Sequence, residues 1–347
     1  MDLYETDHPA TDKNGTYGAL IYHDEALRLI EAHNPATPFF LYLAFQINHA
    51  PLQVPDKYKA YYPCDNKNCT TRQTYQAMTV LADEVLGNVT DALRAKGMWD
   101  NTLVVVSSDN GGPTGTDANS ANNYPLRGGK YSDFEGGVRV AAFVTGGLVP
   151  QERRGIKLGG ADSFVHISDW YTTFCGLAGV DAADDGGVDT AGRSLPSVDG
   201  LDQWPFLSGE APSSPRTVIP FTMGQHQPGD GGAIISGEYK LLFGVQSPAF
   251  WNGPEYPNGT KPAPISVTCG DIGCLYNIID DPTEHHDLAS DPAHAATLAN
   301  LTALFHKYSD GSYQTPWDDN AFNCTGDARV TAMLEGGFWT PWTDKHA

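Results

Sequence analysis

TLVVVSSDNGG at residues 102–112 and YPLRGGKYSDFEGGVRVAAFVT at residues 124–145 decide the predicted fold of this chain. The short, mostly apolar run Thr102–Ser107 has the length and composition of a strand buried in a sheet. It ends at Asp109-Asn110-Gly111-Gly112, where a loop rich in Gly and Asn begins and extends to Gly137. Val138–Thr145 then returns to strand character. The stretch therefore predicts two sheet strands joined by a long polar loop.

Helical and strand-like segments alternate around this stretch. Thr37–Ile47 is another apolar run, which predicts a buried strand, and it stops at Asn48-His49. Arg72–Lys96 places apolar side chains at helical spacing and is followed by Gly97, as is typical of a helix C-terminus. Shorter helices are predicted for His23–His33 and His166–Ala178. This alternation predicts an α/β fold with a large mixed, mostly parallel sheet flanked by helices.

The C-terminal part has a different pattern. Residues 181–232 are rich in Gly, Asp, Pro and Ser and are predicted to be loop and linker. A hairpin is expected over Ala233–Phe243, a short strand over Cys274–Ile279 and a helix over Asp291–Tyr308. We therefore predict two domains: residues 1–218 form the α/β part, and residues 219–347 form a smaller α+β part with an antiparallel sheet and a helix.

Composition and charge restrict the classes of function. The chain has 347 residues, of which 40% are hydrophobic, a proportion typical of a globular protein. Its formal charge of −21 and its pI near 4.7 argue against nucleic acid or an anionic membrane as a partner. We see no apolar run approaching the roughly 18 residues that a membrane-spanning helix needs.

Several sequence features are typical of the secretory pathway. Six N-glycosylation motifs occur, at Asn14, Asn68, Asn88, Asn258, Asn300 and Asn323. Cys64 lies close enough in sequence to Cys69 for a local disulfide, as does Cys269 to Cys274. Cys175 and Cys324 are then either free thiols, or Cys324 has lost a partner outside this sequence. Because residues 1–15 are too polar for a signal peptide, we expect a lysosomal or extracellular protein whose N-terminus is truncated here.

Polar side chains at three places in the sequence are candidates for a binding site. In open α/β sheets, ligands bind beyond the carboxyl ends of strands, where Asp109 and Asn110 are predicted to lie. Their oxygens suit hard cations such as Ca²⁺ or Mg²⁺, although Asp-Asn-Gly-Gly is equally typical of a simple turn. His49 ends the other apolar run and could be a surface residue or a site residue. Lys130 and Arg127 lie in a glycine-rich loop, where they could hold an anion or neutralise neighbouring carboxylates.

Together these segments resemble a known family. PFFLYLAFQINHAPLQVPDKY (residues 38–58), the two stretches quoted first, LYNIIDDPTEHHDL (residues 275–288) and GGFWTPW (residues 336–342) occur in the order found in type I sulfatases of the arylsulfatase B-like, N-acetylgalactosamine 4-sulfatase-like subgroup. The resemblance covers nearly the whole chain. It implies an alkaline phosphatase/sulfatase-like fold with a smaller C-terminal domain.

The resemblance also implies roles for individual residues. Asp109 and Asn110 match two of the family's Ca²⁺ ligands. Lys130 matches a lysine that holds the sulfate group, and His49 matches a histidine at the sulfate or the leaving oxygen. Fixed cations and a metal ion would stabilise the charge that develops when a sulfate monoester is cleaved. Arg139 is expected to pair internally, and Glu135 to shape the loop.

One part of the family pattern is absent from these 347 residues. The family's nucleophile is a formylglycine made from the Cys of a C-x-P-S-R motif, and none of the six cysteines lies in such a motif. The other half of the family's Ca²⁺ ligands is also absent, and we expect both to lie upstream of residue 1. The chain alone is therefore predicted to have little sulfatase activity, and to expose a sheet edge and apolar surface.

The sequence leaves more than one function open. A Ca²⁺-dependent sulfuric ester hydrolase acting on sulfated amino sugars, such as N-acetylgalactosamine 4-sulfate, is the first expectation. Its partner would be a small sulfate ester or a sulfated glycan. The alternatives are an inactive, sulfatase-like secreted glycoprotein that binds anions and cations, or a phosphatase or phosphodiesterase of the same fold.

Overall fold

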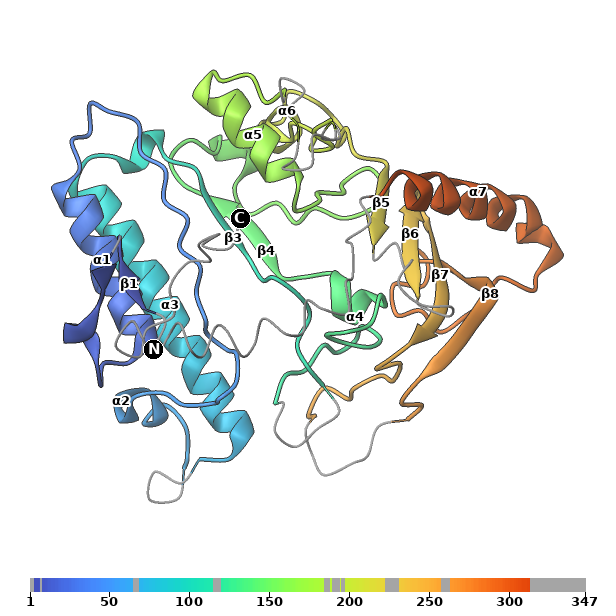
Figure 1. Cartoon of the computed structure of the whole chain (residues 1–347), viewed down its shortest axis with the longest axis horizontal. Coiled ribbons are helices and arrows are strands. Elements are labelled where there is room, and N and C mark those ends of the chain that lie inside the picture. Colours follow the sequence, from blue (N-terminus) through green and yellow to red (C-terminus); the bar gives the residue numbers. More distant parts are fainter. Residues whose placement is uncertain are drawn as a thin grey trace, which may run out of the picture.

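The computed structural model describes residues 3–6, 8–64, 69–114, 120–183, 188, 194, 197–221, 231–256 and 263–312. Figure 1 shows three regions: a helical region near the N-terminus, a short two-stranded sheet in the middle, and a four-stranded sheet with a long helix in the C-terminal part. Within the described part of the chain, no helix is both long enough and apolar enough to cross a membrane.

Two long helices form the core of the N-terminal region. They are α1 (Gly18–Ala32) and α3 (Thr71–Ala95), with the single turn α2 (Asp56–Lys59) packed beside α3. A small hairpin, β1 (Tyr4–Glu5) and β2 (His8–Pro9), and a 3₁₀ turn, η1 (Thr11–Lys13), precede α1. The α1 helix begins five residues earlier than predicted, whereas the prediction for α3 is confirmed to within one residue at each end.

The position of α3 follows from its sequence. The Thr70 side chain accepts a hydrogen bond from the backbone N–H of Gln73, and the Gln73 side chain accepts one from the Thr70 N–H, which is a capping box. The buried side chains of the helix recur at three- and four-residue intervals and face α1: Ala77, Met78, Leu81, Val85, Val89 and Leu93. Gly97 follows the helix with φ +71°, a conformation that favours glycine.

The prediction of a buried strand at Thr37–Ile47 is wrong. The segment has no strand assignment, and its side chains alternate between partly buried and exposed. Phe39, Leu43 and Phe45 pack against the α1 and α3 core, whereas Phe40 and Tyr42 are 71% and 82% exposed. The alternation fits a strand with one buried face, but no neighbouring strand among the described residues supplies a ladder of hydrogen bonds.

Both strands predicted from the opening stretch are present, but the second begins four residues later than predicted, because Val138 ends the helical turn α4 (Glu135–Val138). After the 3₁₀ turn η2 (Trp99–Asn101), β3 (Val104–Ser107) pairs with β4 (Ala142–Thr145) in the register Val104↔Thr145. This pair is antiparallel, whereas the sequence predicted mostly parallel pairing. Between β3 and β4 the described residues hold only α4, and the long loop around it returns the chain to the sheet in the opposite direction. The 3₁₀ turn η3 (Gln151–Arg153) follows β4.

Two helices connect this sheet to the C-terminal part. They are α5 (Asp169–Ala178), which confirms most of the helix predicted there, and α6 (Trp204–Ser208). The buried Asp169 at the start of α5 forms a bidentate ion pair with Arg216, with Nε–Oδ distances of 2.9 and 2.8 Å. Asp169 also accepts hydrogen bonds from the backbone N–H groups of His166 and Leu201. These bonds outweigh the effect of burial, so the pKa of the Asp169 carboxyl is lowered.

The C-terminal sheet has the order β5-β6-β7-β8 and is antiparallel throughout. Its strands are β5 (Val218–Phe221), β6 (Gly232–Ser236), β7 (Tyr239–Gln246) and β8 (Val267–Asn277). The hairpin predicted at Gly237-Glu238 is confirmed, with Ser236 opposite Tyr239. The strand predicted at residue 274 begins seven residues earlier. The 3₁₀ turn η4 (Pro292–His294) leads into the predicted helix, α7 (Ala295–Gly311).

The two faces of this sheet contact different elements. Leu241 and Leu275 pack on one face with Leu301 and Phe305 of α7. On the opposite face, Leu242 and Tyr276 pack with Phe134, which lies in the loop that begins after β3. The mixed α/β class with a C-terminal antiparallel sheet and helix is thus confirmed. The domain division after residue 218 coincides with the start of β5 but stays a prediction.

The local disulfides Cys64–Cys69 and Cys269–Cys274 are both formed, and Cys175 forms none among the described residues. Asn14 and Asn300 are exposed. Asn88 is partly buried on α3, with its amide nitrogen 3.0 Å from Nε2 of His23. The other predicted glycosylation positions (Asn68, Asn258 and Asn323), Cys324 and the GGFWTPW motif lie outside the described residues.

Candidate active site

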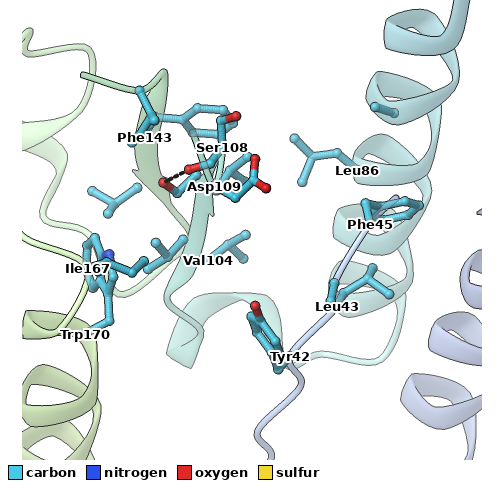
Figure 2. A pocket seen from close by; sticks show the side chains of 18 of the residues that line it. Tyr42, Leu43, Phe45, Leu86, Val104, Ser108, Asp109, Phe143, Ile167 and Trp170 are labelled. Carbon is cyan, nitrogen blue, oxygen red and sulfur yellow. Dashed lines mark hydrogen bonds between the residues drawn. The ribbon is translucent and has the colours of Figure 1, made fainter. Parts of the chain in front are cut away.

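A large cavity of about 3090 Å³ lies between segment 37–49, α3, the β3–β4 pair and α5. Figure 2 shows Tyr42, Leu43 and Phe45 on one side of it, and Val104, Phe143, Ile167 and Trp170 on the other. Most of this lining is apolar. The exposed apolar surface predicted from the sequence is therefore present.

All four predicted site residues line this one cavity. They come from three segments: His49 follows the extended segment, Asp109 and Asn110 follow β3, and Lys130 lies in the loop before α4. Figure 2 places Ser108 and Asp109 at the end of β3, across the cavity from Leu86 of α3. The apolar cavity thus has polar groups from these three segments in its wall.

The DNGG segment is shaped by close backbone packing and is more than a turn. Asp109 Oδ1 accepts a hydrogen bond of 2.8 Å from the Asn110 N–H, and the Asn110 side-chain amide donates one of 2.8 Å to the Gly111 carbonyl. A Cβ atom on Gly111 would lie 1.7 Å from the carbonyl oxygen of Gly136 in α4. Glycine is therefore required at residue 111 for β3 to end against α4.

Asp109 and Asn110 offer the oxygen donors that Ca²⁺ prefers, and Asp109 is exposed to the cavity. Ca²⁺ takes about six to eight such ligands. The described residues contain no group of three or more His, Cys, Asp or Glu side chains placed to hold a metal ion. The chemistry of these two donors fits a hard cation, but their number is too small for a complete site.

Lys130 is held close to the DNGG segment through the backbone. Its N–H donates to the Gly112 carbonyl at 3.2 Å. The Asn123 side chain bridges both segments, because it accepts from the Gly112 N–H at 2.9 Å and donates to the Gly112 and Gly128 carbonyls at 2.9 and 3.0 Å. The Lys130 ammonium lies 5.6 Å from the ring centre of Tyr131 and lines the cavity.

Arg127, the second cation of this loop, has a different environment. Its guanidinium is buried, donates to the Ala249 carbonyl, the Tyr276 hydroxyl and the Glu284 carbonyl, and stacks on Trp251 at 4.3 Å. Of the two roles left open by the sequence, neither applies to Arg127, because its partners are uncharged protein groups. Lys130 is the cation of this pair that lines the cavity.

His49 is exposed, and its Nδ1 lies 2.7 Å from its neighbour's carbonyl oxygen, that of Ala50. The preceding Asn48 donates from its amide to the Thr79 hydroxyl of α3 at 3.0 Å, which fixes this end of the extended segment against the helix. The His49 position is therefore set by α3, while the positions of Asp109 and Lys130 are set by α4 and its loop.

The loop residues Glu135 and Arg139 behave as predicted. Glu135 is buried at the start of α4, and Arg139 Nη1 lies 3.6 Å from Glu135 Oε2. Sequence reasoning missed two buried neighbours of Glu135. Lys240 in β7 pairs with its carboxylate, and the Glu284 carboxylate after β8 accepts a hydrogen bond from its N–H. The sequence feature that could have revealed Lys240 is a single cation within the apolar run of a predicted strand. For Glu284 it is the place of this residue in the DPTEHHDL segment, which is part of the family resemblance.

Comparison with known proteins identifies the family of this chain. A model of the sulfatase family matches residues 4–180, a range that includes all four predicted site residues. Arylsulfatase J of Mus musculus is 33% identical over 98% of this chain and 56% of its own length. N-acetylgalactosamine-6-sulfatase of Homo sapiens is 29% identical over 60% of this chain and 37% of its own length.

A solved structure agrees with these matches. The crystal structure of Ps i-CgsB in complex with k-i-k-neocarrahexaose has a TM-score of 0.63 and 27% identity, covering 92% of this chain and 60% of that protein. The chain spans about half the length of arylsulfatase J. The fold of the chain, the order of its motifs and the family model agree: the chain belongs to the sulfatase family.

Proposed function

We propose that this chain forms the cation-binding and sulfate-binding side of the active site of a sulfuric ester hydrolase. The observation that carries the proposal is that His49, Asp109, Asn110 and Lys130 line one cavity within the part of the chain that matches the sulfatase model. The substrate class we infer is a sulfated sugar. Its support is the N-acetylgalactosamine-6-sulfatase among the relatives and the k-i-k-neocarrahexaose in the complex with Ps i-CgsB.

Each residue has a defined task in this proposal. Asp109 and Asn110 would hold a divalent cation, which when bound would stabilise negative charge on the sulfate oxygens. The Lys130 ammonium would contact a sulfate oxygen, because a fixed cation in a mostly apolar cavity attracts an anion more strongly than it would in water. His49 would donate a hydrogen bond to the sulfate or the leaving oxygen. The nucleophile is not assigned, since the 347 residues contain no C-x-P-S-R motif.

The proposal extends to the compartment. Two local disulfides are formed, and the glycosylation motifs at Asn14 and Asn300 are exposed, as modification would require. We infer that the protein is a glycoprotein of the secretory pathway, lysosomal or extracellular. Mass spectrometry of protein expressed in a secretory host would test this inference, and unmodified Asn14 and Asn300 would contradict the glycosylation.

The test of the function is a binding titration of the purified 347-residue chain with inorganic sulfate, in the presence and absence of CaCl₂. We expect sulfate to bind, and Lys130→Ala to weaken this binding at least tenfold. Asp109→Ala should remove the increase in sulfate affinity that Ca²⁺ produces in the unmodified chain. Lys307→Ala is the matched control, because Lys307 is an exposed lysine on α7 outside the cavity. Equal affinities of the Lys130 and Lys307 variants would refute the assignment of Lys130.

Turnover separates this proposal from a phosphatase of the same fold. The chain alone should release no detectable product from p-nitrophenyl sulfate or p-nitrophenyl phosphate, because the family nucleophile motif is absent from its sequence. Hydrolysis of the sulfate ester would refute that expectation and require another nucleophile. Hydrolysis of the phosphate ester alone would favour a phosphatase of the same fold.

A further inference from the structure

Three buried charged side chains lie between the C-terminal sheet and the loop of the candidate site. We call them the Lys240 cluster: Lys240 of β7, Glu135 at the start of α4, and Glu284 after β8. The Lys240 ammonium lies 3.0 Å from Glu135 Oε1 and 3.1 Å from Glu284 Oε1. The side chains are 0%, 4% and 0% exposed, respectively, so water screens none of these charges.

The cluster is connected to the DNGG segment through α4. Glu284 Oε2 accepts a hydrogen bond of 2.7 Å from the Glu135 N–H. This N–H lies in the first turn of α4, where backbone donors have no acceptor within the helix. Two residues further along α4, the Gly137 carbonyl accepts a hydrogen bond of 2.8 Å from the N–H of Gly111. Gly111 follows Asn110 directly, so a displacement of α4 also displaces the two predicted cation ligands.

A second connection leads to Lys130. Arg127 donates from its guanidinium to the Glu284 carbonyl at 3.0 Å, and its own carbonyl accepts a hydrogen bond of 2.7 Å from the Gly136 N–H. Arg127 begins the short RGGK segment that ends at Lys130. Glu284 has φ +55°, a left-handed conformation that is costly for a residue with a side chain. The backbone at Glu284 is thus held in an unfavourable conformation while it contacts this loop.

Buried charges of this kind are weak stabilisers of a fold, because desolvation offsets most of their attraction. Removing one partner, however, leaves a buried charge uncompensated, so the three side chains of this cluster depend on one another's positions. We propose that Lys240 and Glu284 are positioning residues, which hold α4 and the RGGK segment so that Asp109, Asn110 and Lys130 face the cavity together. This inference rests on the proposed function, because it concerns the geometry of that same site.

The charges of the cluster make the positioning of α4 and the RGGK segment dependent on pH. The charged groups facing Glu284 are Lys240 from β7, Glu135 from α4 and Arg127 from the loop before α4. Burial raises the pKa of Glu284 to about 7, against the opposing effect of Lys240. Below that pH Glu284 is protonated and uncharged, and it lies beside the Lys240–Glu135 ion pair, which has no net charge. Above it, a second buried carboxylate competes for one ammonium, and Arg127 contacts only the backbone of Glu284.

Hydrogen exchange of the full chain, followed by mass spectrometry, tests the inference. The site peptides cover residues 108–114 and 127–139, and the reference peptide covers α3. Lys240→Met should raise exchange in both site peptides at least tenfold at pH 6, with α3 unchanged. Lys57→Met is the matched control, because Lys57 forms an exposed ion pair with Glu84. Unchanged site peptides, or an equal increase in α3, would overturn the inference.

Glu284→Gln keeps the test decisive if Lys240→Met fails to fold. After correction for intrinsic exchange, the wild type should lose protection in the site peptides between pH 6 and pH 8, and this variant should not. Its affinity for inorganic sulfate should likewise stay within twofold over that range, while the wild-type affinity falls several-fold. Identical pH responses of the two proteins would overturn the positioning role. Failure of the wild type to bind sulfate would instead refute the proposed function, and exchange would still decide whether the cluster holds the loop.

Discussion

Replacing Glu284 by glutamine should flatten the dependence of the chain's stability on pH between pH 5 and pH 8. The carboxyl is 0% exposed, and its Oε1 lies 3.1 Å from the Lys240 ammonium. Burial therefore dominates and raises the pKa to about 7, compared with 4.5 for an unperturbed glutamic acid.

The sign and size of the effect follow from linkage. Because the folded-state pKa is above the unfolded one, the folded state binds more protons between pH 4.5 and pH 7. The associated stability is fully present below pH 4.5 and is lost as the pH rises through 7. A shift of this size corresponds to about 3 kcal/mol in total, of which about 2–3 kcal/mol should be lost between pH 5 and pH 8.

Urea unfolding of the wild type and of Glu284→Gln at both pH values measures this contribution as a double difference. Background titrations cancel in it, including that of His166, whose pKa is lowered by burial and by Arg216. The expected result is a wild-type loss at pH 8 that exceeds the loss in the variant by about 2–3 kcal/mol, at equal m-values. The same pH dependence in both proteins would refute the assignment of a protonated Glu284 at pH 5.

Three further substitutions test separate parts of the structure. Arg216→Met should destabilise the chain by about 3–5 kcal/mol, because it leaves the buried Asp169 carboxylate without its cation; a loss below about 1 kcal/mol in urea unfolding would contradict this. Thr70→Ala should cost about 1 kcal/mol through loss of the capping box, whereas Thr70→Ser should retain most of the stability and thereby show that the hydroxyl is responsible. Tyr42→Ser should change the free energy of unfolding by less than about 0.5 kcal/mol, because the ring is 82% exposed, and should reduce binding of a hydrophobic dye to the folded chain; a loss above about 2 kcal/mol would mean that the ring is packed.

Local sequence rules predicted the elements whose stabilising contacts are local or periodic. The α3 helix was found within one residue at each end because its buried side chains and its flanking glycine are all visible in the sequence. The hairpin at Gly237-Glu238 was found for the same reason, since a glycine with φ +58° marks the turn between two apolar runs.

Predictions that depended on distant partners were less successful. The apolar run at Thr37–Ile47 has the composition of a strand, but a strand exists only where a neighbour supplies hydrogen bonds, and composition does not reveal the neighbour. The direction of β4 relative to β3 was likewise hidden, because it depends on the path of a long loop. Lys240 and Glu284 could not be paired from sequence, since they approach each other only through the fold of the C-terminal sheet.

The apolar cavity and the candidate site are formed by the same segments of the chain. His49 follows the extended segment on one side of the cavity, and Asp109 follows β3 on the other side. In the described part of the chain, β3 pairs with β4 on one edge only, and the extended segment pairs with no strand. Both edges carry backbone groups that are free to pair with further strands. The separation of His49 from Asp109 depends on the placement of α3 relative to α4 and its loop, because α3 holds the segment of His49 and α4 holds the segment of Asp109.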